Sequence, residues 1–279
     1  CGYNNVTLCK AIIDRTKDYT NLFIIGATGL IENITALNEV VDYAYNAGLY
    51  FSVYFSHVGY YSQLSTDSDF VPLPWINDTK AKYGEKFLGI YVYDEPGGNQ
   101  IDGDMLRAVR SEQYYVNAAT AYVKNISTHR NMQRYLNSGM MTFTADYCLY
   151  WYDYKIGYDV VLADFGFGND RQLQVSLCRG AAAVQNKDWG IMVTHENGQD
   201  QEMESGPELY NDLVFGYDSG AKYAVIFNYA ETSFYPVEPY QPYEFGTLLD
   251  EHFTAIEDFW TYIQNNPQKQ GSLTSDVAL

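Results

Sequence analysis

Apolar runs alternate with amphipathic stretches along this chain, and the alternation predicts strands separated by helices. Short runs of β-branched and aromatic residues are typical of buried strands. The stretches between them carry apolar residues at intervals of three or four, as Leu37, Val40, Val41 and Ala44 do within 34–47, which predicts amphipathic helices. The predicted strands cover 21–29, 49–56, 87–95, 140–151, 158–164, 189–196 and 222–231.

The predicted helices lie between these strands. They cover 8–19, 34–47, 75–86, 170–186, 206–219 and 246–265. The segment 102–137 is also mostly helical in pattern, but it is too long for one helix of a regular βα unit. We therefore expect a helix pair that bulges from the fold. The aromatic end of the run 140–151 fits a loop as well as a strand.

Four of the apolar runs end in an acidic residue. They read FLGIYVYDE (87–95), YDVVLAD (158–164), WGIMVTHE (189–196) and KYAVIFNYAE (222–231). Carboxylates at the same end of successive parallel strands converge on one site, which predicts an α/β fold of the (β/α)8 TIM-barrel type with an acidic mouth. The alternative for any single residue is that Asp or Glu stands there because the chain turns.

The 279 residues fit one barrel, and no linker or low-complexity block divides them. We predict a single TIM-barrel-like domain over 1–279, with the helical excursion at 102–137. Because the pattern opens with a helix and contains seven strands, the first barrel strand is expected to be missing or to lie before Cys1. A neighbouring chain segment is another way to complete the barrel. The strand at 87 is then the fourth and the strand at 189 the seventh.

The charge and the composition of the chain indicate which classes of partner it can bind. With 17 basic and 35 acidic residues, the net charge of −18 excludes nucleic acid and anionic membranes, which require concentrated positive charge. No apolar run approaches the roughly 20 residues of a membrane span. The 28 tyrosines fit both a carbohydrate site, where rings stack on sugars, and a self-associating surface.

Several features predict an extracellular or cell-surface protein. Glycosylation sequons begin at Asn5, Asn33, Asn77 and Asn125. The four cysteines permit a Cys1–Cys9 loop and a Cys148–Cys178 bridge, with free buried thiols as the alternative for the second pair. A chain that begins at Cys looks processed or trimmed.

The strand order and two short motifs resemble the TIM-barrel retaining glycoside hydrolases. In that superfamily the acid/base Glu ends the fourth strand and the nucleophilic Glu ends the seventh. The matching positions are Glu95, within YDEP (93–96), and Glu196, within THEN (194–197). The resemblance therefore implies a secreted, retaining hydrolase of a polysaccharide or glycan that uses these two carboxylates. The superfamily usually has Asn before the acid/base Glu, whereas this chain has Asp94, which leaves Asp94 as an alternative active carboxylate.

Glycosidic cleavage requires one carboxylic acid to protonate the leaving oxygen and one carboxylate to attack the sugar or activate water. Asp164 and Glu231 either raise the pKa of the acid or bind sugar hydroxyls. Aromatic residues near the mouth, Tyr93 and Phe165 among them, stack on sugars or pack in the core. Adjacent strand residues face opposite sides, so a strand presents only one of each pair Asp94/Glu95 and His195/Glu196 inward, unless Pro96 forces a turn. The expected substrate-binding residues are Asp94, His57, Trp151, Asp164, Tyr229 and Glu231.

Other chemistries lack their motifs. There is no zinc spacing, phosphate-binding loop, EF-hand or serine-nucleophile elbow, and we expect neither a metal nor a cofactor, although an oxygen-rich calcium site among Asp164, Glu196 and Glu231 is conceivable. Two functions from other classes remain open. One is a non-catalytic surface or filament protein built on a barrel, and the other is a carbohydrate-binding protein with a degenerate site.

Overall fold

A computed structural model describes residues 5–26, 30–31, 33–55, 73–102, 112–196, 203–228 and 245–273. Its centre is one sheet of seven parallel strands that pair in chain order. The strands are β1 (Leu22–Ile25), β2 (Tyr50–Phe55), β3 (Phe87–Val92), β4 (Met141–Asp146), β5 (Val160–Phe165), β6 (Asp188–Val193) and β7 (Tyr223–Ile226).

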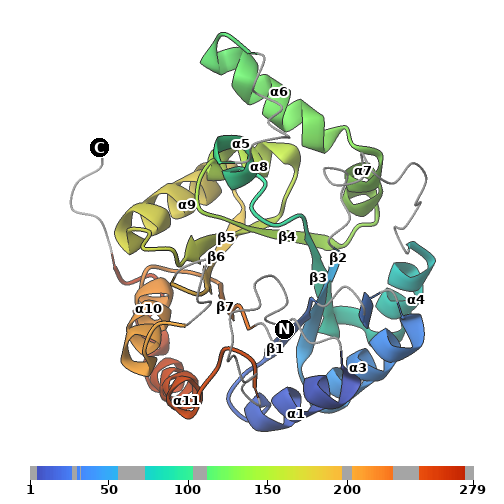
Figure 1. Cartoon of the computed structure of the whole chain (residues 1–279), viewed down its shortest axis with the longest axis vertical. Coiled ribbons are helices and arrows are strands. Elements are labelled where there is room, and N and C mark those ends of the chain that lie inside the picture. Colours follow the sequence, from blue (N-terminus) through green and yellow to red (C-terminus); the bar gives the residue numbers. More distant parts are fainter. Residues whose placement is uncertain are drawn as a thin grey trace, which may run out of the picture.

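Helices cover the outside of the curved sheet and return the chain from the end of one strand to the start of the next (Figure 1). They are α1 (Val6–Thr16), α3 (Ile34–Asn46), α4 (Leu73–Tyr83), α5 (Gly98–Ile101), α6 (Tyr115–Ser127), α7 (Arg130–Asn137), α8 (Tyr150–Ile156), α9 (Arg171–Gln185), α10 (Gly206–Asp218) and α11 (Asp250–Asn265). Two 3-10 turns cover Gly84–Lys86 and Pro267–Lys269. The chain is therefore a TIM barrel, and all seven predicted strands are present.

Apolar side chains fill two layers. Tyr91, Phe143, Leu162 and Met192 pack inside the barrel, while a larger cluster fills the space between sheet and helices. Every residue of β5 is buried, as expected for a parallel strand covered on both sides. The alternation along β5 points Val160 and Leu162 inward, and therefore also the next residue of that series, Asp164.

The described part of the long helical segment, 112–137, holds two helices. Within the described residues, α6 and α7 follow one another, and Figure 1 shows α6 projecting away from the barrel. The aromatic end of the segment 140–151 is not strand, because β4 ends at Asp146 and α8 begins at Tyr150. Leu149 is left-handed, with φ 54°, and this conformation ends the extended backbone before the helix.

The described strands leave the barrel open between β1 and β7. Among the described residues, β1 forms its ladder with β2 and β7 with β6. A cavity of about 250 Å³ lies between them, lined by both strands and by residues of α1 and α11. These helices meet where Arg15 pairs with Asp250 at 3.2 Å. The cavity occupies the place where the sequence pattern leaves a strand unaccounted for.

The cysteine prediction requires a correction. Cys148 and Cys178 carry free thiols, and burial raises the pKa of both. The second predicted bridge is therefore wrong for this structure. Cys9 is buried in α1, while Cys1 lies outside the described residues, so the first pairing stays a prediction. None of the described helices is long and apolar enough to cross a membrane.

Candidate active site

The chain leaves the sheet directly after β3 and presents two successive carboxyl groups. Tyr93 and Glu95 both adopt the left-handed region, with φ 54° and 49°, a conformation that costs non-glycine residues energy and is often found at functional sites. The Glu95 N–H donates to the Ala145 carbonyl at 3.0 Å, and the Asn99 amide donates to the carbonyls of Asp94 and Glu95. Asp94 and Glu95 lie in a turn and not in a strand, so they need not point to opposite faces of the sheet.

Asp94 turns toward the barrel interior. Its Oδ1 accepts a short hydrogen bond from the Tyr91 hydroxyl, which in turn accepts the Ala145 N–H at 3.0 Å. Burial and the nearby charge of Glu95 raise the pKa of Asp94 to about 7, against the opposing effect of the Tyr91 hydrogen bond. Asp94 is therefore a carboxyl group that changes its charge near neutral pH.

Glu95 lies against Asp164, the inward-facing carboxyl group near the end of β5. Asp164 is only 1% exposed, and neither of its oxygens accepts a hydrogen bond from any donor in the described part of the chain. Burial and the charges of Glu95 and Asp94 raise the pKa of Asp164. Burial also raises the pKa of Glu95, although its contact with Asp164 opposes that shift. Two carboxyl groups in contact cannot both be charged at low cost, so the pair holds a proton.

Asp146, at the end of β4, supports this turn from the outer side of the sheet. Its carboxylate accepts the N–H groups of Gly97, Gly98, Tyr147 and Cys148, and it is fully buried. Burial raises its pKa to about 7, and these backbone donors oppose the rise. Asp146 therefore joins the loop after β3 to the loop after β4.

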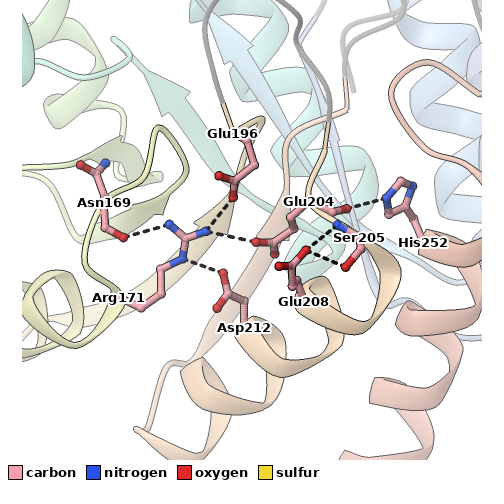
Figure 2. Close-up of polar contacts among 8 residues, drawn as sticks. All are labelled: Asn169, Arg171, Glu196, Glu204, Ser205, Glu208, Asp212 and His252. Carbon is pink, nitrogen blue, oxygen red and sulfur yellow. Dashed lines mark hydrogen bonds and ion pairs between the residues drawn. The ribbon is translucent and has the colours of Figure 1, made fainter.

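Glu196 follows β6 and lies in a different environment. Its side chain is 43% exposed, and Oε1 lies 3.4 Å from Arg171 Nη2. Arg171 is the first residue of α9 and also contacts Glu204 and Asp212 (Figure 2). Because β6 ends at Val193, His195 and Glu196 lie beyond the strand, and the His195 ring packs against Phe167 instead. Glu196 is thus a solvent-accessible carboxylate paired with a cation.

The structure brings together some of the predicted site residues and separates others. Glu95, Asp94 and Asp164 form one cluster, while the described contacts of the Glu196 side chain are with Arg171. Trp151 lies on α8 in the outer helical layer, where Lys155 packs over its ring at 5.3 Å. His57, Tyr229 and Glu231 lie outside the described residues, so their roles stay predictions.

Two aromatic residues expected near the mouth are core residues. Tyr93 and Phe165 are 4% and 0% exposed, and both belong to the cluster between sheet and helices. Their rings are therefore not available to stack on a sugar. Within the described residues, no group of three or more His, Cys, Asp or Glu side chains is arranged to hold a metal ion.

Sequence reasoning missed Arg171, Tyr91 and Asp146. Asp146 ends an apolar run, the same pattern that identified the other acidic residues, and only its uncertain strand assignment hid it. Arg171 stands at the start of a helix, and nothing in the local pattern distinguishes it from an exposed arginine. Its importance follows from the three carboxylates that the fold places around it.

No family model matches the chain, and no curated protein matches it. Several solved structures, however, have a similar fold. Two structures of the family 99 endo-α-mannosidase from Bacteroides thetaiotaomicron align over 95% of this chain, covering 86% and 81% of their own chains, with TM-scores of 0.57 and 0.55 at 11% and 13% identity. A family 5 glycoside hydrolase from Prevotella bryantii aligns over 92% of this chain and 86% of its own, with a TM-score of 0.46 at 12% identity.

At these identities the likeness establishes the fold. The chain has a TIM-barrel fold, as its strand order predicted. Its substrate and its chemistry must be argued from the carboxyl groups themselves.

Proposed function

We propose that this protein is a retaining glycoside hydrolase in which Glu95 is the acid/base and Glu196 the nucleophile. The observation that carries the proposal is the contrast between the two carboxyl groups. Glu95 is partly buried beside Asp164, with a raised pKa, whereas Glu196 is exposed and paired with Arg171. Carboxyl groups in unlike environments are the general arrangement for dividing acid and nucleophile roles.

The environment of Glu95 suits proton donation. Burial raises the pKa of Glu95 and so favours its protonated form, the form that can donate a proton to the glycosidic oxygen as the bond breaks. Glu95 and Asp94 are both partly accessible, whereas Asp164 is not. Asp164 therefore acts through Glu95, and Asp94 is the second carboxyl group within reach of a bound sugar.

The substrate that we propose is a glycan or polysaccharide, consistent with the glycosidase fold, and the endo-α-mannosidase neighbours make α-mannans the first substrates to screen. We also propose that the protein is secreted or displayed on the cell surface. The four sequon asparagines are exposed, and Asn5 and Asn33 cap α1 and α3 through Oδ1. The amide nitrogen that would carry a glycan is a different atom from this capping oxygen.

A panel of aryl glycosides and polysaccharides, assayed with the wild-type protein, tests the proposal. Glu95→Gln and Glu196→Gln are each expected to reduce kcat at least 1,000-fold, because each removes one half of the displacement. Azide is expected to restore turnover in a small-residue variant of Glu196, with inverted product. Glu257→Gln, an exposed carboxylate of α11, is the matched control. Full activity in Glu196→Gln would remove Glu196 from the mechanism.

One observation favours a second function, that of a self-associating surface protein. Tyr114, Tyr115 and Val116 are 69%, 97% and 77% exposed at the start of α6, the helix that projects from the barrel (Figure 1). Exposed apolar clusters of this kind are typical of interaction sites. Concentration-dependent assembly that Tyr115→Ser abolishes, in a protein without activity on any glycoside, would favour this function over hydrolysis.

A further inference from the structure

Arg171 is the centre of a compact ionic cluster beside the proposed nucleophile. Its Nε lies 2.7 Å from Asp212 Oδ2, and its Nη2 lies 3.1 Å from Glu204 Oε2 and 3.4 Å from Glu196 Oε1. Nη1 donates to the Asn169 carbonyl at 3.0 Å. Figure 2 shows the guanidinium surrounded by the three carboxylates, which follow β6, precede α10 and lie on α10. One cation thus serves three acidic groups.

The charges of this cluster do not balance if all three carboxylates are ionised. The side chains of Glu204 and Asp212 are only 5% and 15% exposed, so water cannot screen them well. Glu204 Oε1 is buried and accepts no hydrogen bond from any donor among the described residues. An unpaired buried charge costs several kcal/mol. One proton on the two buried carboxyl groups makes them neutral together with Arg171, and it leaves the excess negative charge on Glu196, which water reaches.

We propose that Glu204 and Asp212 share one proton beneath Arg171, and that this proton makes Arg171 the positioning residue that holds Glu196. The inference rests on the proposed function for the role of Glu196, but the shared proton itself does not. The shared proton explains why Arg171, which already contacts the buried Glu204 and Asp212, also contacts the more exposed Glu196.

The surroundings of Glu204 support the shared proton. The groups that face it are Arg171 of α9, Asp212 of α10, Glu196 after β6 and His252 of α11, whose Nε2 contacts the Glu204 carbonyl at 2.7 Å. Burial, followed by the charge of Asp212, raises the pKa of Glu204 to about 8 against the opposing effect of Arg171. Burial also raises the pKa of Asp212, and its contacts with Arg171 and then with Glu204 oppose that rise.

Glu204 and Glu196 both bind Nη2 of Arg171, and loss of the shared proton changes which of them binds it more strongly. At neutral pH Glu204 is uncharged and attracts Nη2 weakly, so Nη2 also binds Glu196. When Glu204 ionises, its full charge stands 3.1 Å from Nη2, closer than Glu196 at 3.4 Å and less well hydrated. The guanidinium then shifts toward the buried pair, and Glu196 is released. The proposed nucleophile is therefore held below about pH 8 and freed above it.

Carbon-13 NMR of the glutamate side-chain carboxyls, recorded from pH 4 to 10 on the wild-type protein, tests the shared proton without any substrate. We expect one glutamate carboxyl to titrate near pH 8 and the Arg171 side-chain nitrogen resonances to move with the same midpoint. Glu204→Gln is expected to abolish both transitions, and Glu257→Gln, which removes an exposed charge of α11, to leave them unchanged.

Two results would overturn the proposal. One is a wild-type protein in which every glutamate titrates below pH 6, a result that needs no variant to fold. The other is an Arg171 signal that does not move between pH 6 and 9. If hydrolysis is found, the part of the alkaline change in kcat with its midpoint near pH 8 should vanish in Glu204→Gln with KM unchanged, while the limb set by Glu95 remains. If none is found, the proposed function fails while the NMR result still decides the shared proton.

Discussion

The carboxyl group of Asp164 lies against that of Glu95 and has no donor among the described residues. An inward-facing carboxyl at the end of a barrel strand is costly to bury when no donor in the described part of the chain binds it. Such a cost is typical of a functional position. The pair therefore links the architecture of the barrel to the proposed acid/base chemistry.

Asp164→Leu should raise the pKa of Glu95. The contact with Asp164 favours the ionised form of Glu95 and opposes the effect of burial, and leucine removes that contact while filling a similar volume. Where the pH exceeds that pKa, each unit of increase raises the protonated fraction of Glu95, and with it kcat, about tenfold. The alkaline limb of the kcat profile should move to higher pH, and the carbon-13 titration of Glu95 should move equally. An unchanged Glu95 titration in a folded variant would contradict the contact.

The pH dependence of stability should be unusual. Asp94 and Asp146 have pKa values raised to about 7, and Glu204 to about 8. A carboxyl group with a raised folded-state pKa binds its proton more tightly in the folded protein, so its stabilisation is full below the unfolded-state value near 4 and is lost as pH rises to the folded-state value. Unfolding should therefore occur at a temperature several degrees higher at pH 5 than at pH 8.

Thermal unfolding at several pH values checks this expectation, and the net charge of −18 acts in the same direction because protonation reduces self-repulsion. Glu204→Gln should flatten the decline between pH 5 and 8. A stability maximum above pH 7 would show that these carboxyl groups are ionised in the folded protein.

Much of the fold was predictable from the sequence because its strands are buried on both faces. Runs such as 158–164 read as continuous apolar segments, and β5 is buried throughout. The failure at 140–151 has a local cause: the left-handed Leu149 begins a new helix inside an aromatic stretch that has no proline or glycine to mark the boundary. Short helices that depend on tertiary packing leave little periodicity to detect.

The site was less predictable, for a physical reason. Strand ends revealed Glu95, Asp164 and Glu196, because carboxylates after apolar runs stand out in a sequence. The partners that set their chemistry, Arg171 and Tyr91, come from the start of a helix and from within a strand. Only the packing of the barrel brings them to the carboxylates, so local pattern could not have assigned either role.

Tyr91→Phe should destabilise the protein by about 1–3 kcal/mol, the cost of a buried donor left unsatisfied. The Tyr91 hydroxyl accepts the Ala145 N–H at 3.0 Å and donates to Asp94, so both partners lose their hydrogen bond and the pKa of Asp94 should rise. Urea unfolding measures the effect. Tyr262→Phe, which breaks a partly exposed bond to Asp218, is the control and should cost less than about 1 kcal/mol because water replaces the hydroxyl. Equal losses in the two variants would argue against the buried bridge.

Gly97→Ala should distort the turn that carries Glu95. A Cβ at Gly97 would lie 2.6 Å from Asp146 Oδ2 and 2.7 Å from Leu149 Cβ, so either the turn or the Asp146 carboxylate must move. Because Asp146 also accepts the N–H groups of the adjacent residues, the expected loss is about 2–4 kcal/mol of stability, with a fall in any hydrolytic kcat.

Gly180→Ala is the matched control: this exposed glycine of α9 has nothing within 4 Å of the added methyl, and the change should stabilise the helix by about 0.5–1 kcal/mol. Chemical denaturation of both variants separates the two effects, and a Gly97 variant as stable as the wild type would mean that Asp146 does not hold the turn.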